Sequence, residues 1–200
     1  YESFLDKKGI PQIAPTATWE PTHPDILGPF HVPGAPFRGK VTAPLAKGTV
    51  LVVRGRLWGF DTRKPIKHAV LDVWQADHLG RYDMTDPRQP PEWHEFRNRI
   101  RLVTDETGYY EYETIRPAAY RAGRAIRPAH IHYMVQAPGY GKLITQLYFK
   151  GDPNIARDRS ARQSNLLVAP QDKKVTGGTY QLATFDIVLT KSAQASRRRR

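Results

Sequence analysis

From residue 48 to residue 190, the chain alternates short apolar runs with turn residues. The run at 48–60 includes Val50, Leu51, Val52, Val53, Leu57 and Trp58, a β-branched and aromatic composition typical of a strand. The same reasoning predicts further strands at 68–75, 99–104, 109–115, 129–137, 143–149 and 180–190. Thr104–Gly108 has the composition of a hairpin turn. Many short strands separated by turn signals indicate an all-β fold, either a β-sandwich or a small barrel.

No segment shows sustained helical periodicity, although residues 152–165 could hold a short helix. The first forty residues carry seven prolines, at positions where helices and central strands would be broken. We therefore expect an extended N-terminal arm over residues 1–45, one β-sandwich domain over 46–191 and a basic, disordered tail over 192–200. Within the arm, Gly28-Pro29-Phe30 is expected to turn and deliver an aromatic ring to a pocket.

Composition narrows the class of protein. Hydrophobic residues make up 40% of the 200 residues and charged residues 25%, which is typical of a globular domain. The chain has no cysteine, which excludes disulfides, zinc–thiolate sites, iron–sulfur clusters and a cysteine nucleophile. No apolar run approaches the ~18 residues of a membrane span, so a membrane is not an expected partner.

The formal net charge is +12, and Arg197 to Arg200 supply four of those charges. A solvated tail on a basic surface is the simplest interpretation, and steering of anionic substrates is the alternative. Nucleic acid is not an expected partner, because no binding motif is present and the aromatic residues are not interleaved with the basic run. The chain begins at Tyr1 rather than Met, so secretion after removal of a leader stays possible, although the cytoplasm is favoured.

The most informative motif is Arg127-Pro128-Ala129-His130-Ile131-His132. Residues i and i+2 of a strand point the same way and lie roughly 6 to 7 Å apart along it. His130 and His132 could therefore hold one metal ion. Imidazole suits zinc, copper and iron, so the pair alone does not identify the metal.

The surroundings exclude some architectures that use His-x-His. A cupin would need a glutamate further along the strand, yet residues 133–136 contain none, and a barrel hydrolase would need a longer chain. The first carboxylate after the pair, Asp152, lies twenty residues further along the chain. Two tyrosines are available instead: Tyr82 and Tyr120 each follow a predicted strand, in loops of the kind on which sites are built.

Four ordered motifs resemble the intradiol ring-cleavage dioxygenases. Asp72-Val73-Trp74-Gln75-Ala76-Asp77 followed by Gly80-x-Tyr82 is similar to the family's first tyrosine motif, and Gly108 to Pro117 followed by Tyr120 to its second. Arg127–His132 matches the family's histidine motif, and Leu143–Pro153 resembles protocatechuate 3,4-dioxygenase subunits. Phe185–Leu189 resembles their last strand. The likeness covers roughly residues 25 to 190 and is closest to the compact class of the family.

The resemblance implies a β-sandwich of two mixed sheets whose long loops carry the metal site. It also implies one Fe(III) per chain, held by Tyr82, Tyr120, His130 and His132. Phenolate is a hard anionic donor that stabilises ferric iron. The implied reaction inserts both atoms of O2 between the hydroxyl-bearing carbons of a catechol-type substrate and gives a cis,cis-muconate-type dicarboxylate.

The resemblance also suggests roles beyond iron binding. Tyr120 is expected to leave the iron and accept a substrate proton, and Arg127 to stabilise negative charge that develops on the ring. The remaining candidates are expected to line the substrate or support the ligands: Gln146, Tyr148, Trp74, Gly28 and Pro29.

Two departures from relatives that take protocatechuate concern the substrate. Those relatives carry a tryptophan two residues after the second tyrosine, where this chain has Ala122, and apolar residues where it has Ala156-Arg157-Asp158-Arg159-Ser160. A basic pocket would suit an anionic catechol.

The alternative to an enzyme is a non-catalytic β-sandwich module that binds polyphenols or carbohydrates. For the enzyme, the expected partners are a catechol, O2 and further copies of the chain in a homo-oligomer.

Overall fold

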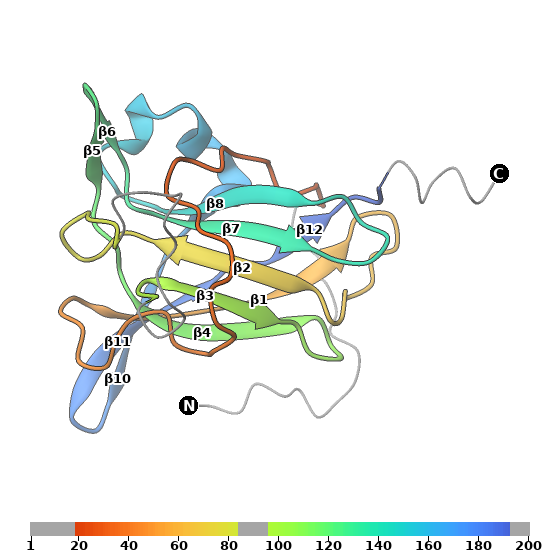
Figure 1. Cartoon of the computed structure of the whole chain (residues 1–200), viewed down its shortest axis with the longest axis horizontal. Coiled ribbons are helices and arrows are strands. Elements are labelled where there is room, and N and C mark those ends of the chain that lie inside the picture. The colour runs from red at the N-terminus through yellow and green to blue at the C-terminus, as the bar shows by residue number, and fades with distance from the viewer. Residues whose placement is uncertain (1–18, 84–95, 193–200) are drawn as a thin grey trace.

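The computed structural model describes residues 19–83 and 96–192, which form two packed sheets and a small hairpin at one end (Figure 1). The strands are β1 (Val50–Gly59), β2 (Val70–Gln75), β3 (Arg99–Val103), β4 (Tyr109–Ile115), β5 (Tyr120–Ala122), β6 (Ala125–Arg127), β7 (His130–Gln136), β8 (Leu143–Phe149), β9 (Leu167–Val168), β10 (Gln171–Val175), β11 (Gly178–Thr184) and β12 (Ile187–Leu189). The all-β class is confirmed. The predicted tail beyond Ser192 and residues 1–18 of the predicted arm lie outside the described residues.

The first sheet is organised around β1, the longest strand described. β4 pairs with it antiparallel, whereas β11 and β12 pair with it in parallel, so the sheet is mixed as the resemblance implied. β10 completes the sheet as the antiparallel neighbour of β11. The predicted strand at 48–60 is shortened at its start, where Gly48 has a φ of +125°, a value outside the extended region.

The prediction of a single strand at 180–190 is wrong, because the chain forms two strands, β11 and β12, which are separated by Phe185 and Asp186. A Cβ on Gly55 would lie 2.0 Å from the Phe185 carbonyl oxygen, so only glycine permits this approach of the two backbones. Asp186 then accepts the Arg56 N–H through its side chain at 2.8 Å, in place of a ladder bond.

The second sheet has the order β3-β2-β7-β8-β9 and carries the histidine motif on a central strand. Its pairs are antiparallel except β8 with β9, so this sheet is mixed too. The short helix predicted at 152–165 is replaced by three single 3₁₀ turns: Ile155–Arg157, Ser160–Arg162 and Ser164–Leu166. Asp152 and Asp158 accept nearby backbone N–H groups with their side chains, and such bonds compete with a continuous helix.

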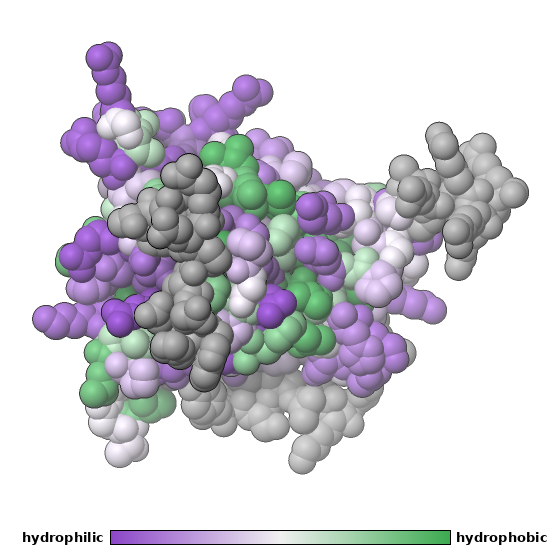
Figure 2. All heavy atoms as spheres, in the orientation of Figure 1, coloured by the Kyte–Doolittle hydropathy of each residue, from purple (hydrophilic) through white to green (hydrophobic). Residues whose placement is uncertain are grey.

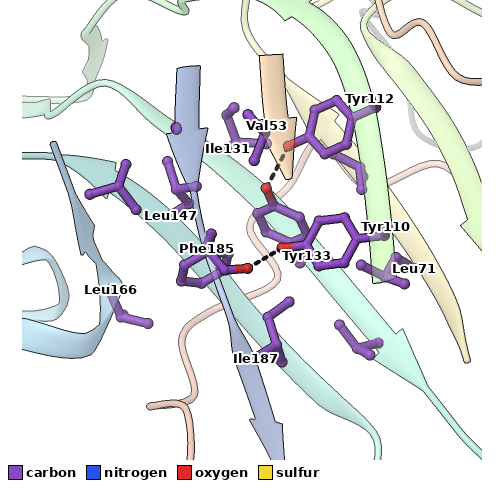
Figure 3. Packing of buried hydrophobic residues seen from close by; sticks show 14 of the residues in the cluster. Val53, Leu71, Tyr110, Tyr112, Ile131, Tyr133, Leu147, Leu166, Phe185 and Ile187 are labelled. Carbon is purple, nitrogen blue, oxygen red and sulfur yellow. Dashed lines mark hydrogen bonds between the residues drawn. The ribbon is translucent and has the colours of Figure 1, made fainter. Parts of the chain in front are cut away.

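The inner faces of the two sheets form one apolar core. Alternate residues of β7, Ile131, Tyr133 and Val135, point into it and are fully buried. Each apolar side chain buried in this way contributes roughly 1.5–3 kcal/mol. Tyr112 and Tyr133 satisfy each other's hydroxyl groups inside the core, and Tyr110 donates to the Phe185 carbonyl (Figure 3).

Residues 25–37 cross the outer face of the second sheet without forming a strand of their own (Figure 1), whereas Thr22 and Val41 on either side of them bond to β12 and β4 of the first sheet. The Asp25 N–H donates to the Ile144 carbonyl of β8 at 2.8 Å, and Phe37 bridges to Arg101 of β3. We call this segment the arm. Because it passes over β8, β7, β2 and β3, it lies directly above the outward-facing side chains of these strands.

The opposite face of the sandwich has a groove of about 440 Å³ over β1, β4 and β11. Its lining includes Val50, Glu111 and Glu113 but no histidine, so it is separate from the histidine motif. Within residues 19–83 and 96–192, no helix is long and apolar enough to cross a membrane.

Candidate metal centre

The alternation of β2, β7 and β8 places six polar or aromatic side chains on the outer face of the second sheet. On β7, His130 and His132 point outward while Ile131 points into the core. His132 pairs with Trp74 of β2 and with Gln146 of β8. Asp72 and Tyr148 occupy the neighbouring outward positions. The strand pairing therefore assembles this group of side chains before any loop is considered.

The two imidazoles face each other across a short gap. The Nε2 atoms of His130 and His132 are 3.1 Å apart, and both residues are at most 2% exposed. His130 Nδ1 lies 2.7 Å from the Pro128 carbonyl oxygen, which can only accept, so this nitrogen carries the proton and Nε2 presents a lone pair. Burial and the nearby Arg127 lower the pKa of His130 to about 4, so its imidazole is neutral at pH 7.

Tyr82 reaches the same gap from the loop that follows β2. Its hydroxyl is 3.1 Å from His132 Nε2. Asp77 shapes the loop by accepting the Leu79 and Arg81 N–H groups at 2.8 and 2.9 Å. Burial and the neighbouring Tyr120 raise the pKa of Tyr82 well above its usual value. Such a phenol becomes a phenolate only beside a strong positive charge.

Tyr120 comes from the β5–β6 hairpin and completes the ring of four side chains. Its ring centroid lies 5.5 Å from those of both His130 and Tyr82. Tyr120 is half-buried, and burial raises its pKa while Arg127 opposes the rise. Arg121, Ala122 and Arg124 of the same hairpin are exposed, and this end of the molecule is largely hydrophilic in Figure 2.

His130, His132 and Tyr82 are spaced to share a metal ion, and Tyr120 packs beside them against His130 and Tyr82. Two donors about 2.1 Å from one ion and at right angles to each other lie about 3 Å apart, which is the spacing of the His130, His132 and Tyr82 donor atoms. Among the described residues, no three His, Cys, Asp or Glu side chains gather to hold a metal. A centre here therefore depends on the tyrosines, and phenolate favours a hard, highly charged cation such as Fe(III).

Arg127 extends this centre toward β8. Its guanidinium donates to Asp158 at 2.7 Å, to Gln146 at 2.9 Å and to the Tyr148 hydroxyl at 2.6 Å. These contacts fix the direction of its charge. Of the arginine-rich run suggested for a basic pocket, Arg157 and Arg159 are exposed, and Asp158 is the residue that turns inward to Arg127.

The arm supplies contacts that the sequence did not indicate. The Tyr148 hydroxyl is 2.8 Å from Asp25, and Gln146 donates to the Ile26 carbonyl at 2.9 Å.

Phe30 stacks on Tyr82 with ring centroids 4.0 Å apart, so the ring expected from Gly28-Pro29-Phe30 covers the site of its own chain. Pro29 occupies the turn that aims this ring.

A buried ion pair beside Tyr82 was also missed. Arg99 is 1% exposed and donates to Asp83 at 2.7 Å, while its other nitrogen donates to the Phe30 carbonyl. Arg99 thus holds the residue after Tyr82 and the residue stacked on Tyr82. Arg99 pairs with Trp74 and so lies on the outer face, under the arm. An arginine at the start of an edge strand is a weak signal by itself, and its partners lie 16 and 69 residues away.

Gly28 and Trp74 both contact His132. Gly28 has a φ of +72°, and a Cβ there would lie 3.3 Å from His132 Cε1. Trp74 stacks on the His132 ring with centroids 4.7 Å apart and an interplanar angle of 5°. Trp74, Gln146 and Tyr148 therefore contact a ligand candidate or the arm, and Gly28 and Pro29 belong to the part of the arm that precedes Phe30.

Comparison with known proteins gives one family. A family model described as dioxygenase matches residues 26–191. Catechol 1,2-dioxygenase 2 of Acinetobacter lwoffii is 35% identical over 175 residues, and 6-chlorohydroxyquinol 1,2-dioxygenase of Cupriavidus pinatubonensis is 36% identical over 184. These alignments cover 79% and 84% of this chain but only 62% and 64% of the relatives. The chain thus spans less than two thirds of their length.

A solved structure matches over its whole length. It is the dioxygenase domain of a dioxygenase–carbohydrate-binding fusion from Streptomyces sp. SirexAA-E, with a TM-score of 0.72 and 34% identity. The match covers 86% of this chain and 100% of that domain.

Proposed function

Because the chain belongs to the intradiol ring-cleavage dioxygenase family, we propose that it cleaves catechol-type aromatics between their two hydroxyl-bearing carbons. Both atoms of O2 enter the product, a cis,cis-muconate-type dicarboxylate. The observation that carries the proposal is the convergence of His130, His132, Tyr82 and Tyr120 on one buried point. The names of the relatives favour this reaction over a non-catalytic binding module.

Tyr82, Tyr120, His130 and His132 would hold one Fe(III) per chain. Two phenolates offset part of the ferric charge, while two neutral imidazoles add none. When bound, the ion supplies a position at which both catechol oxygens bind and the ring becomes reactive toward O2.

Tyr120 is assigned to accept a proton from the substrate at its phenolic oxygen. It is the half-buried member of the pair, on a hairpin of two three-residue strands, so it can turn away as a catechol enters. Tyr82 is covered by Phe30 and keeps its place. The two tyrosines thus divide the work between a fixed ligand and a proton acceptor.

Arg127 is assigned to stabilise negative charge on the substrate ring. Its guanidinium is held by Asp158, Gln146 and Tyr148, so it needs no reorientation when charge develops. Phe30 and Trp74 shield the centre from water on the arm side.

The test begins with colour. Protein loaded with Fe(III) should show a broad visible band from phenolate-to-iron charge transfer, and the band should shift when catechol is added. Oxygen uptake and muconate-type absorbance should then rise together. A preparation that stays colourless after iron loading would contradict the proposal. A specificity constant for protocatechuate above that for catechol would support an anionic substrate, and equal constants would remove that argument.

A further inference from the structure

The two histidines are oriented by different kinds of contact. His130 has the familiar arrangement, in which Nδ1 donates to a backbone carbonyl. His132 has no such bond: its Nδ1 is buried and has no hydrogen-bond partner among the described residues. Something else must set the plane of its ring if Nε2 is to stay 3.1 Å from both His130 Nε2 and the Tyr82 hydroxyl.

Trp74 is the side chain that defines this plane. It lies almost parallel to the imidazole, at 5° and 4.7 Å between centroids, and is 1% exposed. The Trp74 Nε1 also has no hydrogen-bond partner among the described residues, so the indole acts here through its face. Since Trp74 and His132 are paired residues on adjacent strands, the sheet itself holds the two rings in register.

The arm completes the support from two directions. His31 packs edge-on against Trp74 at 4.7 Å, and its Nε2 lies 3.2 Å from the Asp72 carboxylate, two residues along β2 from Trp74. Gly28 lies against the Cε1 edge of His132, where a side chain would be in close contact. The imidazole is therefore bounded on one face by Trp74 and at one edge by Gly28.

We propose that Trp74 is the positioning residue of His132, and that the arm, through Gly28 and His31, keeps this ring aimed at the metal. The inference rests on the proposed metal centre and deepens it. It makes the arm a part of the metal site in addition to a cover over it. Positioning groups around metal ligands typically alter metal affinity about 10- to 100-fold when removed.

The first experiment compares metal affinity in tryptophan variants. Trp74→Leu removes the stacked ring, Trp74→Phe keeps a smaller one, and Trp58→Leu removes a buried indole of β1 that packs on Trp19 instead. Fe(III) affinity is measured by chelator competition, Zn(II) affinity in parallel, and unfolding temperature on the same samples. We expect Trp74→Leu to bind both metals about 10- to 100-fold more weakly, with Trp74→Phe and Trp58→Leu within about threefold of the starting protein.

The second experiment uses two arm glycines that share a left-handed backbone. Gly28 has a φ of +72°, and an added Cβ there would lie 3.3 Å from His132 Cε1, whereas Gly34 has a φ of +90° and an added Cβ there meets nothing within 4 Å. Ala at either position strains the backbone in the same way. We expect Gly28→Ala to weaken metal binding and to shift the visible band of the iron form, and Gly34→Ala to do neither.

Three results would overturn the inference: metal affinity unchanged in Trp74→Leu, an equal loss in Trp58→Leu, or a starting protein that binds neither metal. Neither affinity measurement requires a catechol. A protein that binds metal with the expected pattern of variants but cleaves no catechol would end the proposed reaction and leave the role of Trp74 intact.

Discussion

The loop that carries Tyr82 and the hairpin that carries Tyr120 each bring a tyrosine to the metal centre. The two segments differ in how many contacts hold them in place. The Tyr82 loop is tied by Asp77, by the Asp83–Arg99 pair and by the stacked ring of Phe30. The β5–β6 hairpin has six strand residues, of which Tyr120 and Arg127 alone are partly buried. Local stability follows the number of buried contacts, so one tyrosine is fixed and the other can move.

Loss of Arg99 should have the largest effect, because Arg99 anchors the loop that carries Tyr82. Arg99→Met leaves Asp83 as an uncompensated buried charge and frees the Phe30 carbonyl from its donor. Breaking a buried pair in this way typically costs about 3–5 kcal/mol, which denaturant unfolding will measure. Lys67→Met, which breaks the exposed pair with Glu106, is the control and should change stability little. Equal losses in the two variants would mean that Arg99 does not anchor the loop.

Removal of each phenolic oxygen in turn should sharpen the comparison. Tyr82→Phe deletes the hydroxyl oxygen that lies 3.1 Å from His132 Nε2. We expect it to weaken Fe(III) binding about 10- to 100-fold. Tyr120→Phe should retain iron better, keep part of the visible band and slow the cleavage step, because the proton acceptor is missing. Iron content after dialysis against a chelator and single-turnover rates distinguish the two. Equivalent behaviour of both variants would remove the division of roles.

A small change in the β5–β6 hairpin should have the smallest effect. Gly123 connects β5 to β6 with a φ of +62°, and an added Cβ there meets no atom within 4 Å. Gly123→Ala should strain only the hairpin, at about 1 kcal/mol. Hydrogen exchange is expected to accelerate in residues 120–127 while the unfolding temperature stays nearly constant. A large fall in unfolding temperature would show that the hairpin is integral to the fold.

The sequence was most informative where a local rule decides the outcome. The strands at 109–115 and 143–149 have the predicted bounds, since alternation and turn residues act within a few positions. The strand predicted at 68–75 begins instead at Val70, because His68 has a φ of +55°. Arg99 contacts Phe30, and Asp25 contacts Tyr148. His31 contacts both Trp74 and Asp72. The residues of each pair are at least 41 positions apart in the sequence. No local pattern encodes such contacts.

By itself, the sequence determined that His130 and His132 share one face of a strand, because side chains alternate with a period of two. Its ordered motifs also indicated the family and named the two tyrosines. Only the tertiary structure decided that Tyr82 is covered by Phe30 while Tyr120 lies half-buried on a hairpin, and that Trp74 stacks on the ring of His132 beneath the arm. The physical reason is that these differences depend on long-range packing and buried charge, which arise only when distant segments come together.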